Sequence, residues 1–230
     1  MDEALGIIMR LLTEPEPITY ESDWFTLNEA RIHLRPYTQP HFPIAVAAAG
    51  TPSGMILAGK HGAGVISFSA IREGAVSSKL SDFWNIAEET AAEHGKTMDR
   101  GEWRIVQYAF LAESRKEAFE QARERAGHYQ RVYVENILGR KSDFDGPADK
   151  VVEAMVDTGV WCVGTPDDLI ATIERLDEES GGFGCLLIHA NEWGTREQVL
   201  HSHELLARYV MPRFQGSVTS LESSERWAGD

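Results

Sequence analysis

The sequence of 230 residues is poor in cysteine, in positive charge and in long apolar runs. Its two cysteines, Cys162 and Cys185, cannot form a disulfide framework, which fits a reducing, cytoplasmic location. The formal net charge of −14 disfavours nucleic acid and membrane surfaces as partners, because both are anionic. No apolar run approaches the roughly 20 residues of a membrane-spanning helix. These absences leave a soluble globular protein as the expected class.

Several motifs of catalytic chemistry are also missing. The sequence has no G-x-S-x-G elbow, no H-E-x-x-H pair and no C-x-x-C pair, so hydrolase, metalloprotease and zinc-site functions lose support. His201 and His203 are close in sequence but would point to different faces of one helix, which makes them poor joint metal ligands. We therefore predict no metal site, and these motifs assign no catalytic residue.

The chain opens almost directly into a predicted helix over residues 3–12, with no strand before it. Its first residues are acidic and lack a small-residue cleavage site, so we do not expect them to form a signal peptide. Residues 16–43, rich in proline and aromatics, are interpreted as a loop with a short hairpin around residues 18–20 and 24–27. An α/β domain that begins on a helix is unusual, and this start predicts an N-terminally truncated domain.

Short apolar runs then alternate with helical patterns, with strands predicted over residues 44–49, 64–68, 103–111 and 184–188. Strands of this kind between long helices are typical of a parallel sheet covered by helices. One leading helix and about four strand–helix units correspond to half of a (β/α)8 barrel, with a doubly wound sheet as the alternative. Residues 139–160 are interpreted as an insertion and residues 217–230 as a disordered tail.

The most informative segment is the turn from the first predicted strand into its helix, AAAGTPSG over residues 47–54. Small side chains let a flat ligand approach, and glycine lets the backbone present its N–H groups. Hydroxyl groups add donors, and the helix N-terminus adds partial positive charge. These features predict a site for one phosphate, against the plain alternative of a capped helix. No Walker lysine follows, which disfavours a nucleoside triphosphatase. The candidate cofactor-binding residues are Ala49, Gly50, Thr51, Ser53 and Gly54.

A second turn, Gly164-Thr165-Pro166, has similar letters but is followed at once by Asp167 and Asp168. Two acids in the first turn of a helix would repel a phosphate, whereas they favour the helix dipole. We therefore interpret this turn as a helix cap only.

His189 lies at the C-terminal end of a predicted strand, and Asn191, Glu192 and Trp193 follow it. Active sites of (β/α)8 barrels lie at the C-terminal ends of the strands, which makes His189 a candidate for a direct role. The alternative is a structural or merely exposed histidine.

A series of segments carries a family resemblance, and they are residues 22–31 (SDWFTLNEAR), 34–37 (LRPY), 40–47 (PHFPIAVA), 52–55 (PSGM), 57–62 (LAGKHG), 99–100, 103–104, 164–168 (GTPDD), 180–184 (SGGFG) and 204–212 (ELLARYVMP). Together and in this order, over residues 1–216, the segments resemble the luciferase-like flavin-dependent monooxygenases. Within that family they are similar to the limonene-monooxygenase-like group.

The resemblance implies a (β/α)8 barrel with insertions, here a partial barrel over residues 1–216 that lacks the first four strands. It also implies reduced flavin mononucleotide (FMN) supplied by a separate flavin reductase, or a deazaflavin coenzyme instead. The family's monooxygenases use O₂ to oxygenate an aldehyde, alkene or similar apolar molecule. The family's phosphate site follows the fifth strand and falls here on Gly50, Thr51, Ser53 and Gly54.

Two departures from the family pattern matter. The missing strands carry much of the family's substrate pocket, and Phe110 stands where the group often has histidine, which puts a proton-handling role there in doubt.

Open sheet edges invite pairing, so we expect a homo-oligomer or association with the missing N-terminal half. The functional alternatives are a non-catalytic flavin-binding protein of the family and a deazaflavin-dependent oxidoreductase.

Overall fold

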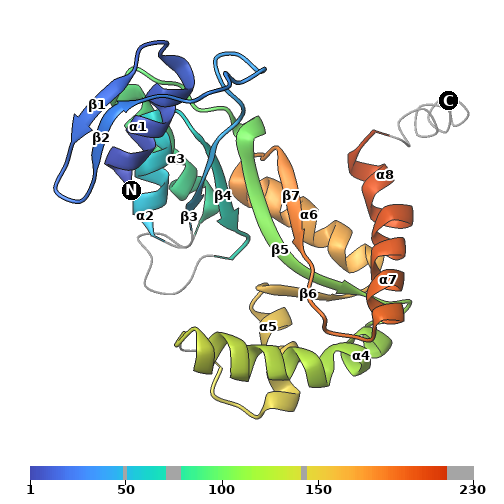
Figure 1. Cartoon of the computed structure of the whole chain (residues 1–230). Coiled ribbons are helices and arrows are strands. Elements are labelled where there is room, and N and C mark those ends of the chain that lie inside the picture. The colour runs from blue at the N-terminus through green and yellow to red at the C-terminus, as the bar shows by residue number, and fades with distance from the viewer. Residues whose placement is uncertain (49–50, 71–78, 141–143, 217–230) are drawn as a thin grey trace, which may run out of the picture. The chain divides into compact units, whose positions relative to one another are not determined.

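The computed structural model describes residues 1–48, 51–70, 79–140 and 144–216, and it divides into two compact units (Figure 1). Unit 1 comprises residues 1–67 and 71–104, and unit 2 comprises residues 68–70 and 105–230. The chain passes from one unit to the other within strands β4 (Gly64–Phe68) and β5 (Trp103–Leu111). The predicted tail, residues 217–230, lies outside the described residues.

Unit 1 begins with helix α1 (Asp2–Thr13) and an antiparallel hairpin of β1 (Ile18–Glu21) and β2 (Thr26–Ala30). The hairpin is tied to α1 through one carboxylate. The Tyr20 hydroxyl donates to Oε1 of Glu3 at 2.8 Å, and Nε1 of Trp24 donates to Oε2 of Glu3 at 2.8 Å. Both the leading helix and the hairpin predicted from the sequence are confirmed.

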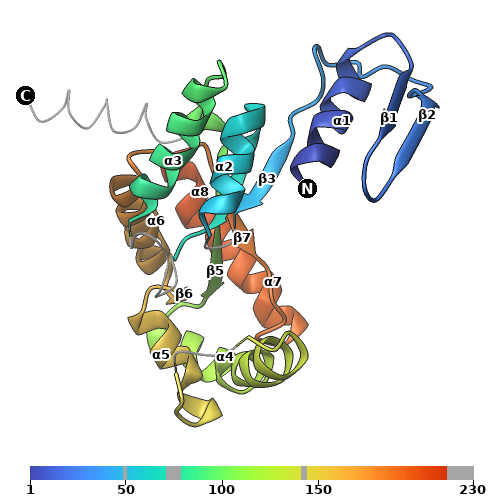
Figure 2. The same ribbon diagram turned by 90° about the vertical axis from the view of Figure 1, so that its left-hand side faces the viewer.

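Two strand–helix units follow in unit 1, with β3 (Ala45–Ala48) before α2 (Pro52–His61) and β4 before α3 (Leu80–Glu93). Strands β3 and β4 pair in parallel, as the apolar runs predict. Helices α2 and α3 pack side by side (Figure 2). Gly59 makes this approach possible, because a Cβ atom there would overlap the backbone carbonyl of Ala87.

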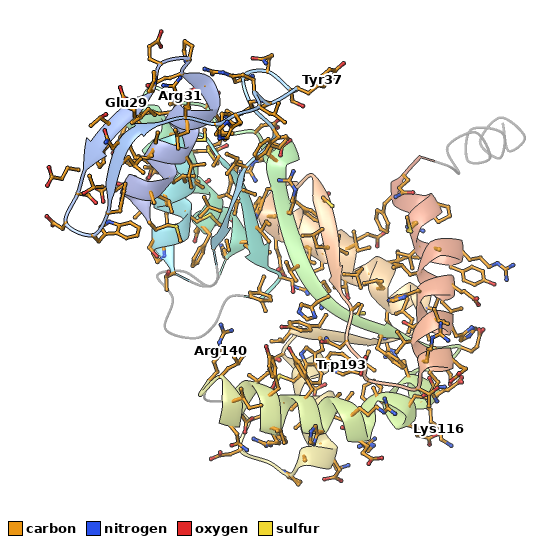
Figure 3. All side chains as sticks on the ribbon, viewed as in Figure 1. Glu29, Arg31, Tyr37, Lys116, Arg140 and Trp193 are labelled. Carbon is orange, nitrogen blue, oxygen red and sulfur yellow. The ribbon has the colours of Figure 1, made fainter. Side chains whose placement is uncertain are left out.

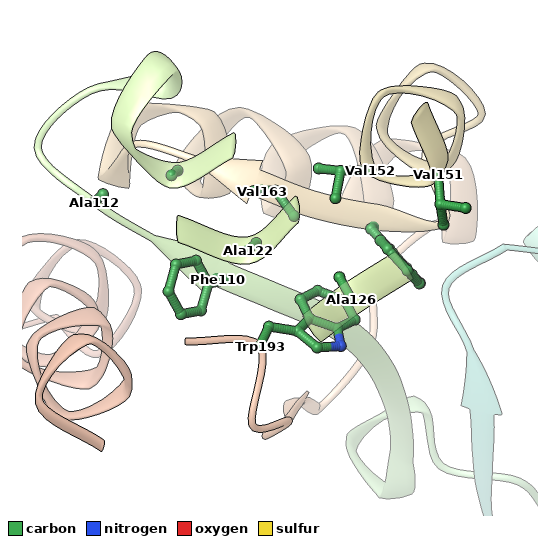
Figure 4. Close-up of a cluster of buried hydrophobic side chains, with 10 residues drawn as sticks. Phe110, Ala112, Ala122, Ala126, Val151, Val152, Val163 and Trp193 are labelled. Carbon is green, nitrogen blue, oxygen red and sulfur yellow. The ribbon is translucent and has the colours of Figure 1, made fainter. Parts of the chain in front are cut away.

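Unit 2 is built on the long strand β5, which pairs in parallel with β6 (Trp161–Gly164) and also pairs with β7 (Cys185–His189). Its core is lined by small residues of α4 and by aromatic and aliphatic side chains of the strands (Figure 4). The helical segments are α4 (Arg115–His128), the π-helix η2 (Tyr129–Ile137), η3 (Ala148–Lys150), α5 (Val151–Asp157), α6 (Pro166–Ser180), α7 (Arg196–Leu205), η4 (Leu206–Val210) and α8 (Met211–Phe214).

The count of about four strand–helix units from the sequence is too low, because β6 was not predicted. Five strands, β3 to β7, are each followed by a helix. The predicted insertion, residues 139–160, also contains the helical segments η3 and α5. Strand β6 has only four residues, all of them buried, so it carries too little sequence pattern to separate it from the preceding segment.

Candidate functional site

The β3–α2 turn, residues 49–54, connects the last small residues of β3 to the first turn of α2. Ala49 and Gly50 of the predicted phosphate site lie outside the described residues, whereas Thr51, Ser53 and Gly54 are described. A Cβ atom on Gly54 would lie 2.7 Å from Cα and 2.8 Å from Cβ of Ala48. Glycine is therefore required for α2 to begin directly against the end of β3.

Among the described residues, no side chain accepts a hydrogen bond from the backbone N–H groups in the first turn of α2. Thr51 stands at the N-cap with extended backbone, but among the described residues its hydroxyl accepts no bond from the helix and instead lies 2.8 Å from the Ser53 hydroxyl. The first turn of α2 contains no acidic side chain, and both Thr51 and Ser53 are exposed. The first N–H groups of a helix lack partners inside the helix, so here they face outward beside two hydroxyl groups.

Three other helices that follow strands, α4, α6 and α7, have side-chain caps on their first N–H groups, whereas α3 has none among the described residues. The Thr165 hydroxyl of α6 accepts from the backbone N–H of Asp168, whose carboxylate accepts from the Thr165 N–H at 2.8 Å. Arg115 donates to the same carboxylate, and this hydrogen bond is the main cause that holds the pKa of Asp168 below its usual range. The predicted cap at Thr165 is thus confirmed, and this turn has no room for an anion.

The contrast shows what the β3–α2 turn can do chemically. Among the described residues it combines a glycine that admits no side chain, two hydroxyl groups, a helix N-terminus without a side-chain cap and a first helical turn without an acidic residue. A phosphate group fits this donor set, because backbone N–H groups and the helix dipole both favour an anion.

Unit 2 has a cavity of about 560 Å³ on the face of α4 and η2 that is wide open to solvent. Trp193 forms a buried wall, and the neighbouring Tyr129 is half-buried. The remaining lining residues are exposed, and they are Glu124, Arg125, His128, Tyr133 and Glu192. Its interior is therefore aromatic, whereas its rim carries charges of both signs.

An aromatic cluster lies behind this cavity and is formed by Tyr108, Tyr129, Trp161, His189 and Trp193. Trp161 and Trp193 have ring centroids 4.2 Å apart, and the rings of Tyr108 and His189 are 4.5 Å apart. Burial, and then a hydrogen bond with Tyr108, raise the pKa of Tyr129 far above its ordinary value. Tyr129 is therefore a neutral hydroxyl at any physiological pH.

The histidine singled out from the sequence joins this cluster. His189 is the last residue of β7, and its Nδ1 atom is buried without a hydrogen-bond partner among the described residues. Phe110 stands at the position where the limonene-monooxygenase-like group often has histidine. It is 2% exposed and packs in the core beside Trp193, so it handles no proton. The sequence did not indicate Tyr108 or Tyr129, because neither lies at the end of a strand.

The two neighbouring histidines on α7 do not combine. His201 lies 3.3 Å from a carboxylate oxygen of Glu113 and 3.7 Å from one of Glu204. Within the part of the chain that the structure describes, no group of three or more His, Cys, Asp or Glu side chains could hold a metal ion. None of the described helices has the length and apolar composition needed to cross a membrane.

Comparison with known proteins relates the sequence of this chain to one family. The family model described as "Luciferase-like monooxygenase" matches residues 1–182. The chain is 37% identical over 229 residues to 4-hydroxyprotoasukamycin monooxygenase of Streptomyces nodosus subsp. asukaensis, covering 99% of this chain. It is 39% identical over 222 residues to limonene 1,2-monooxygenase of Rhodococcus erythropolis, covering 95% of this chain. It spans 62% and 55% of the lengths of these two relatives.

A solved structure shows the same fold. The oxygenating constituent of 3,6-diketocamphane monooxygenase from Pseudomonas putida, a type II Baeyer–Villiger monooxygenase in complex with FMN, superposes with a TM-score of 0.70. It is 24% identical, and the match covers 91% of this chain and 62% of that one. The α/β architecture with parallel strand pairing agrees with this likeness. On the family model and the two curated relatives, the chain belongs to the luciferase-like monooxygenase family.

Proposed function

We propose that this chain is part of a flavin-dependent monooxygenase and that its β3–α2 turn binds the phosphate of FMN. The observation that carries the proposal is the first turn of α2, where Gly54 fits tightly against Ala48 and no side chain caps the helix among the described residues. The FMN in the Pseudomonas putida relative supports this cofactor, and the deazaflavin coenzyme stays the alternative because an F420-dependent secondary alcohol dehydrogenase has the same fold, with a TM-score of 0.62.

The proposed roles follow from the chemistry of each group. The hydroxyls of Thr51 and Ser53 are 2.8 Å apart, so one donates to the other and the second donates to a phosphate oxygen, and the N–H groups of Ser53 and Gly54 complete the donor set. Ala49 and Gly50, which lie outside the described residues, belong to the same proposed site by their place in the sequence. When bound, the reduced flavin supplies the reaction with O₂ that oxygenates an organic molecule.

The proposed substrate is a small, apolar organic molecule, which the name of the limonene 1,2-monooxygenase relative supports. A non-catalytic flavin-binding protein is the second candidate, because the chain spans 62% and 55% of the two curated relatives. Substrate turnover with a flavin reductase and O₂ supports the first candidate. Flavin binding without turnover supports the second.

The architecture and the partners are part of the same proposal. We propose that residues 1–216 form one barrel domain, a partial barrel, in the cytoplasm. Its open strand edges pair with a second copy or with the barrel's N-terminal half, and a separate flavin reductase supplies reduced FMN. Gel filtration of the purified chain tests the association, and a compact monomer contradicts it.

The phosphate site is tested by adding one negative charge. Ser53→Asp is tolerated by the fold, because Ser53 is exposed and an acid in the first turn of a helix is favourable. The same charge repels a phosphate, so we expect the affinity for reduced FMN to fall by about tenfold or more. Riboflavin, which lacks the phosphate, keeps its affinity. Anaerobic calorimetric titration with both flavins measures the difference.

Ser53→Asn is the matched control, since it has nearly the size of the aspartate without its charge. This variant retains most of the FMN affinity. Thermal unfolding shows that both variants are folded. An unchanged affinity of Ser53→Asp for FMN, or an equal loss for riboflavin, rules out the turn as the phosphate site.

A further inference from the structure

Strand β3 lies at one end of its sheet and has an open side. In the strand order β3-β4-β5-β6 it pairs only with β4 among the described residues. The carbonyl of Ile44, the residue before β3, accepts from the N–H of Gly64 at 2.8 Å, so the backbone groups of Ile44 point toward β4. These groups alternate in direction along a strand. Val46 therefore also faces β4, whereas the N–H and C=O groups of Ala45 and Ala47 face the open side.

The backbone groups on the open side have no other partner. Within the part of the chain that the structure describes, no hydrogen bond reaches the backbone of Ala45 or Ala47 from outside the β3–β4 pair. Ala47 is also exposed to solvent. Unpaired N–H and C=O groups along a sheet edge are the groups with which a strand from another chain pairs.

Strand β3 lacks the features by which edge strands usually prevent such pairing, which are charged side chains, proline and bulges. The hairpin of unit 1 has two of these features. Its register shifts between Ile18 and Tyr20, and Glu29 of β2 projects into solvent (Figure 3). Residues 44–48 consist of isoleucine, valine and alanine alone. The open side of β3 is therefore unprotected.

A second copy of the same strand fits this side because the arrangement is self-complementary. When two β3 strands run antiparallel about a twofold axis at Val46, Ala45 of each copy lies opposite Ala47 of the other. Both alanines face outward, so each pair exchanges N–H···O=C bonds in both directions. The two Val46 side chains then form a close, non-hydrogen-bonded pair of β-branched residues. Pro43, at the preceding outward position, has no N–H and cannot extend this ladder as a donor.

We propose that two copies of this chain pair through the open sides of their β3 strands, antiparallel and centred on Val46. This proposal rests on the proposed association of the chain, and it names the partner, the strand and the register of the contact. The paired segment carries no charge, whereas each whole copy has a formal net charge of −14. Salt screens the repulsion between the copies, so the dimer is expected to tighten as salt is added. A contact made of ion pairs would weaken instead.

The variant Ala45→Pro tests the contact. It removes an N–H that is unpaired in the single chain, and proline is tolerated at such an edge position. The dimer loses this donor in both copies. We expect its dissociation constant, measured by analytical ultracentrifugation of the full chain without flavin, to rise by about tenfold or more. Ala45→Ser is the matched control, because it keeps the N–H and is close in size, and it retains the wild-type constant. Thermal unfolding shows whether both variants are folded.

Hydrogen exchange in the wild type tests the same contact without a substitution, and it decides the matter if Ala45→Pro does not fold. The amides of Ala45 and Ala47 are expected to exchange at least about tenfold more slowly in concentrated dimer than in dilute monomer. Val46 is the internal control, since its N–H faces β4 in both states. Its exchange rate is expected to stay nearly constant.

Three results would overturn the proposal. A monomer at every concentration excludes the second copy and leaves the N-terminal half as the occupant of the edge. A dimer that folded Ala45→Pro leaves unchanged does not use β3. Concentration-dependent protection confined to another strand contradicts this contact but keeps the association itself. Because no flavin is present, each result is independent of the FMN titration.

Discussion

At the scale of single residues, Gly54 and Ser53 have different roles in the β3–α2 turn. Gly54 is a packing requirement, since any side chain there meets the backbone of Ala48. Ser53 is exposed and free to vary in charge, so it reports on the ligand rather than on the fold. Thr51, Ser53 and Gly54 could all be named from the sequence, because a glycine and two hydroxyls between a strand and a helix form a local pattern.

The packing role of Gly54 can be separated from the general effect of glycine in helices. Gly54→Ala is expected to destabilise the protein by about 1–3 kcal/mol, because the added methyl overlaps Ala48. Gly6→Ala in α1 is the control, since a Cβ there meets only Cε1 of His61 at 3.5 Å. That variant is expected to gain about 0.5–1 kcal/mol from helix propensity. Chemical denaturation measures both, and equal effects contradict the packing argument.

The aromatic cluster could not be predicted from the sequence. Tyr108 lies in the middle of β5, and Tyr129 is the first residue of a π-helix. They meet His189 and Trp193 only because β5 pairs with β7 and the segment after β7 returns toward α4. His189 was named because it ends a strand, a feature that local pattern does reveal.

At the scale of elements, helix N-termini distinguish structural turns from the proposed binding turn. Helices α4, α6 and α7 each have a side-chain cap on their first N–H groups, from Ser114, Thr165 and Thr195. In α2 the Thr51 hydroxyl bonds to Ser53 instead. The sequence left a capped helix as the alternative at the turn that contains Thr51 and predicted a cap at the turn of Thr165, and a side-chain capping bond is present only at Thr165 of these two.

This difference predicts unequal costs for the same substitution. Thr165→Ala removes a capping bond and is expected to cost about 1 kcal/mol of stability. Thr51→Ala removes no such bond and is expected to leave stability nearly unchanged while weakening FMN binding. Urea unfolding followed by circular dichroism compares the two. A similar loss in both variants means that Thr51 caps α2 in solution, which leaves fewer donors for a phosphate.

The sequence predicted most elements but missed strand β6. Strand β5 was predicted over residues 103–111, which are its bounds in the structure, because it carries a long regular pattern. Strand β6 has four residues and borders a mixed segment, so its pairing with β5 is visible only in three dimensions. Short strands are defined by their neighbours rather than by their own residues.

At the scale of the whole molecule, the sequence placed the chain in its family. The ordered segments over residues 1–216 identified the luciferase-like monooxygenases, and the family model confirms this over residues 1–182. The likeness to the Pseudomonas putida structure supports the α/β barrel type over a doubly wound sheet. Spacing alone left both folds open, because parallel strands covered by helices occur in each.

The central claim, that the β3–α2 turn holds the phosphate of a flavin, is tested most directly by amide chemical shifts in the folded protein. Spectra of ¹⁵N-labelled chain are recorded with FMN and then with riboflavin. The account predicts shifts of the Ser53 and Gly54 amides that appear with FMN and are absent with riboflavin, because only FMN brings the phosphate to their N–H groups. Identical spectra with both flavins, or phosphate-dependent shifts confined to other helices, would contradict it.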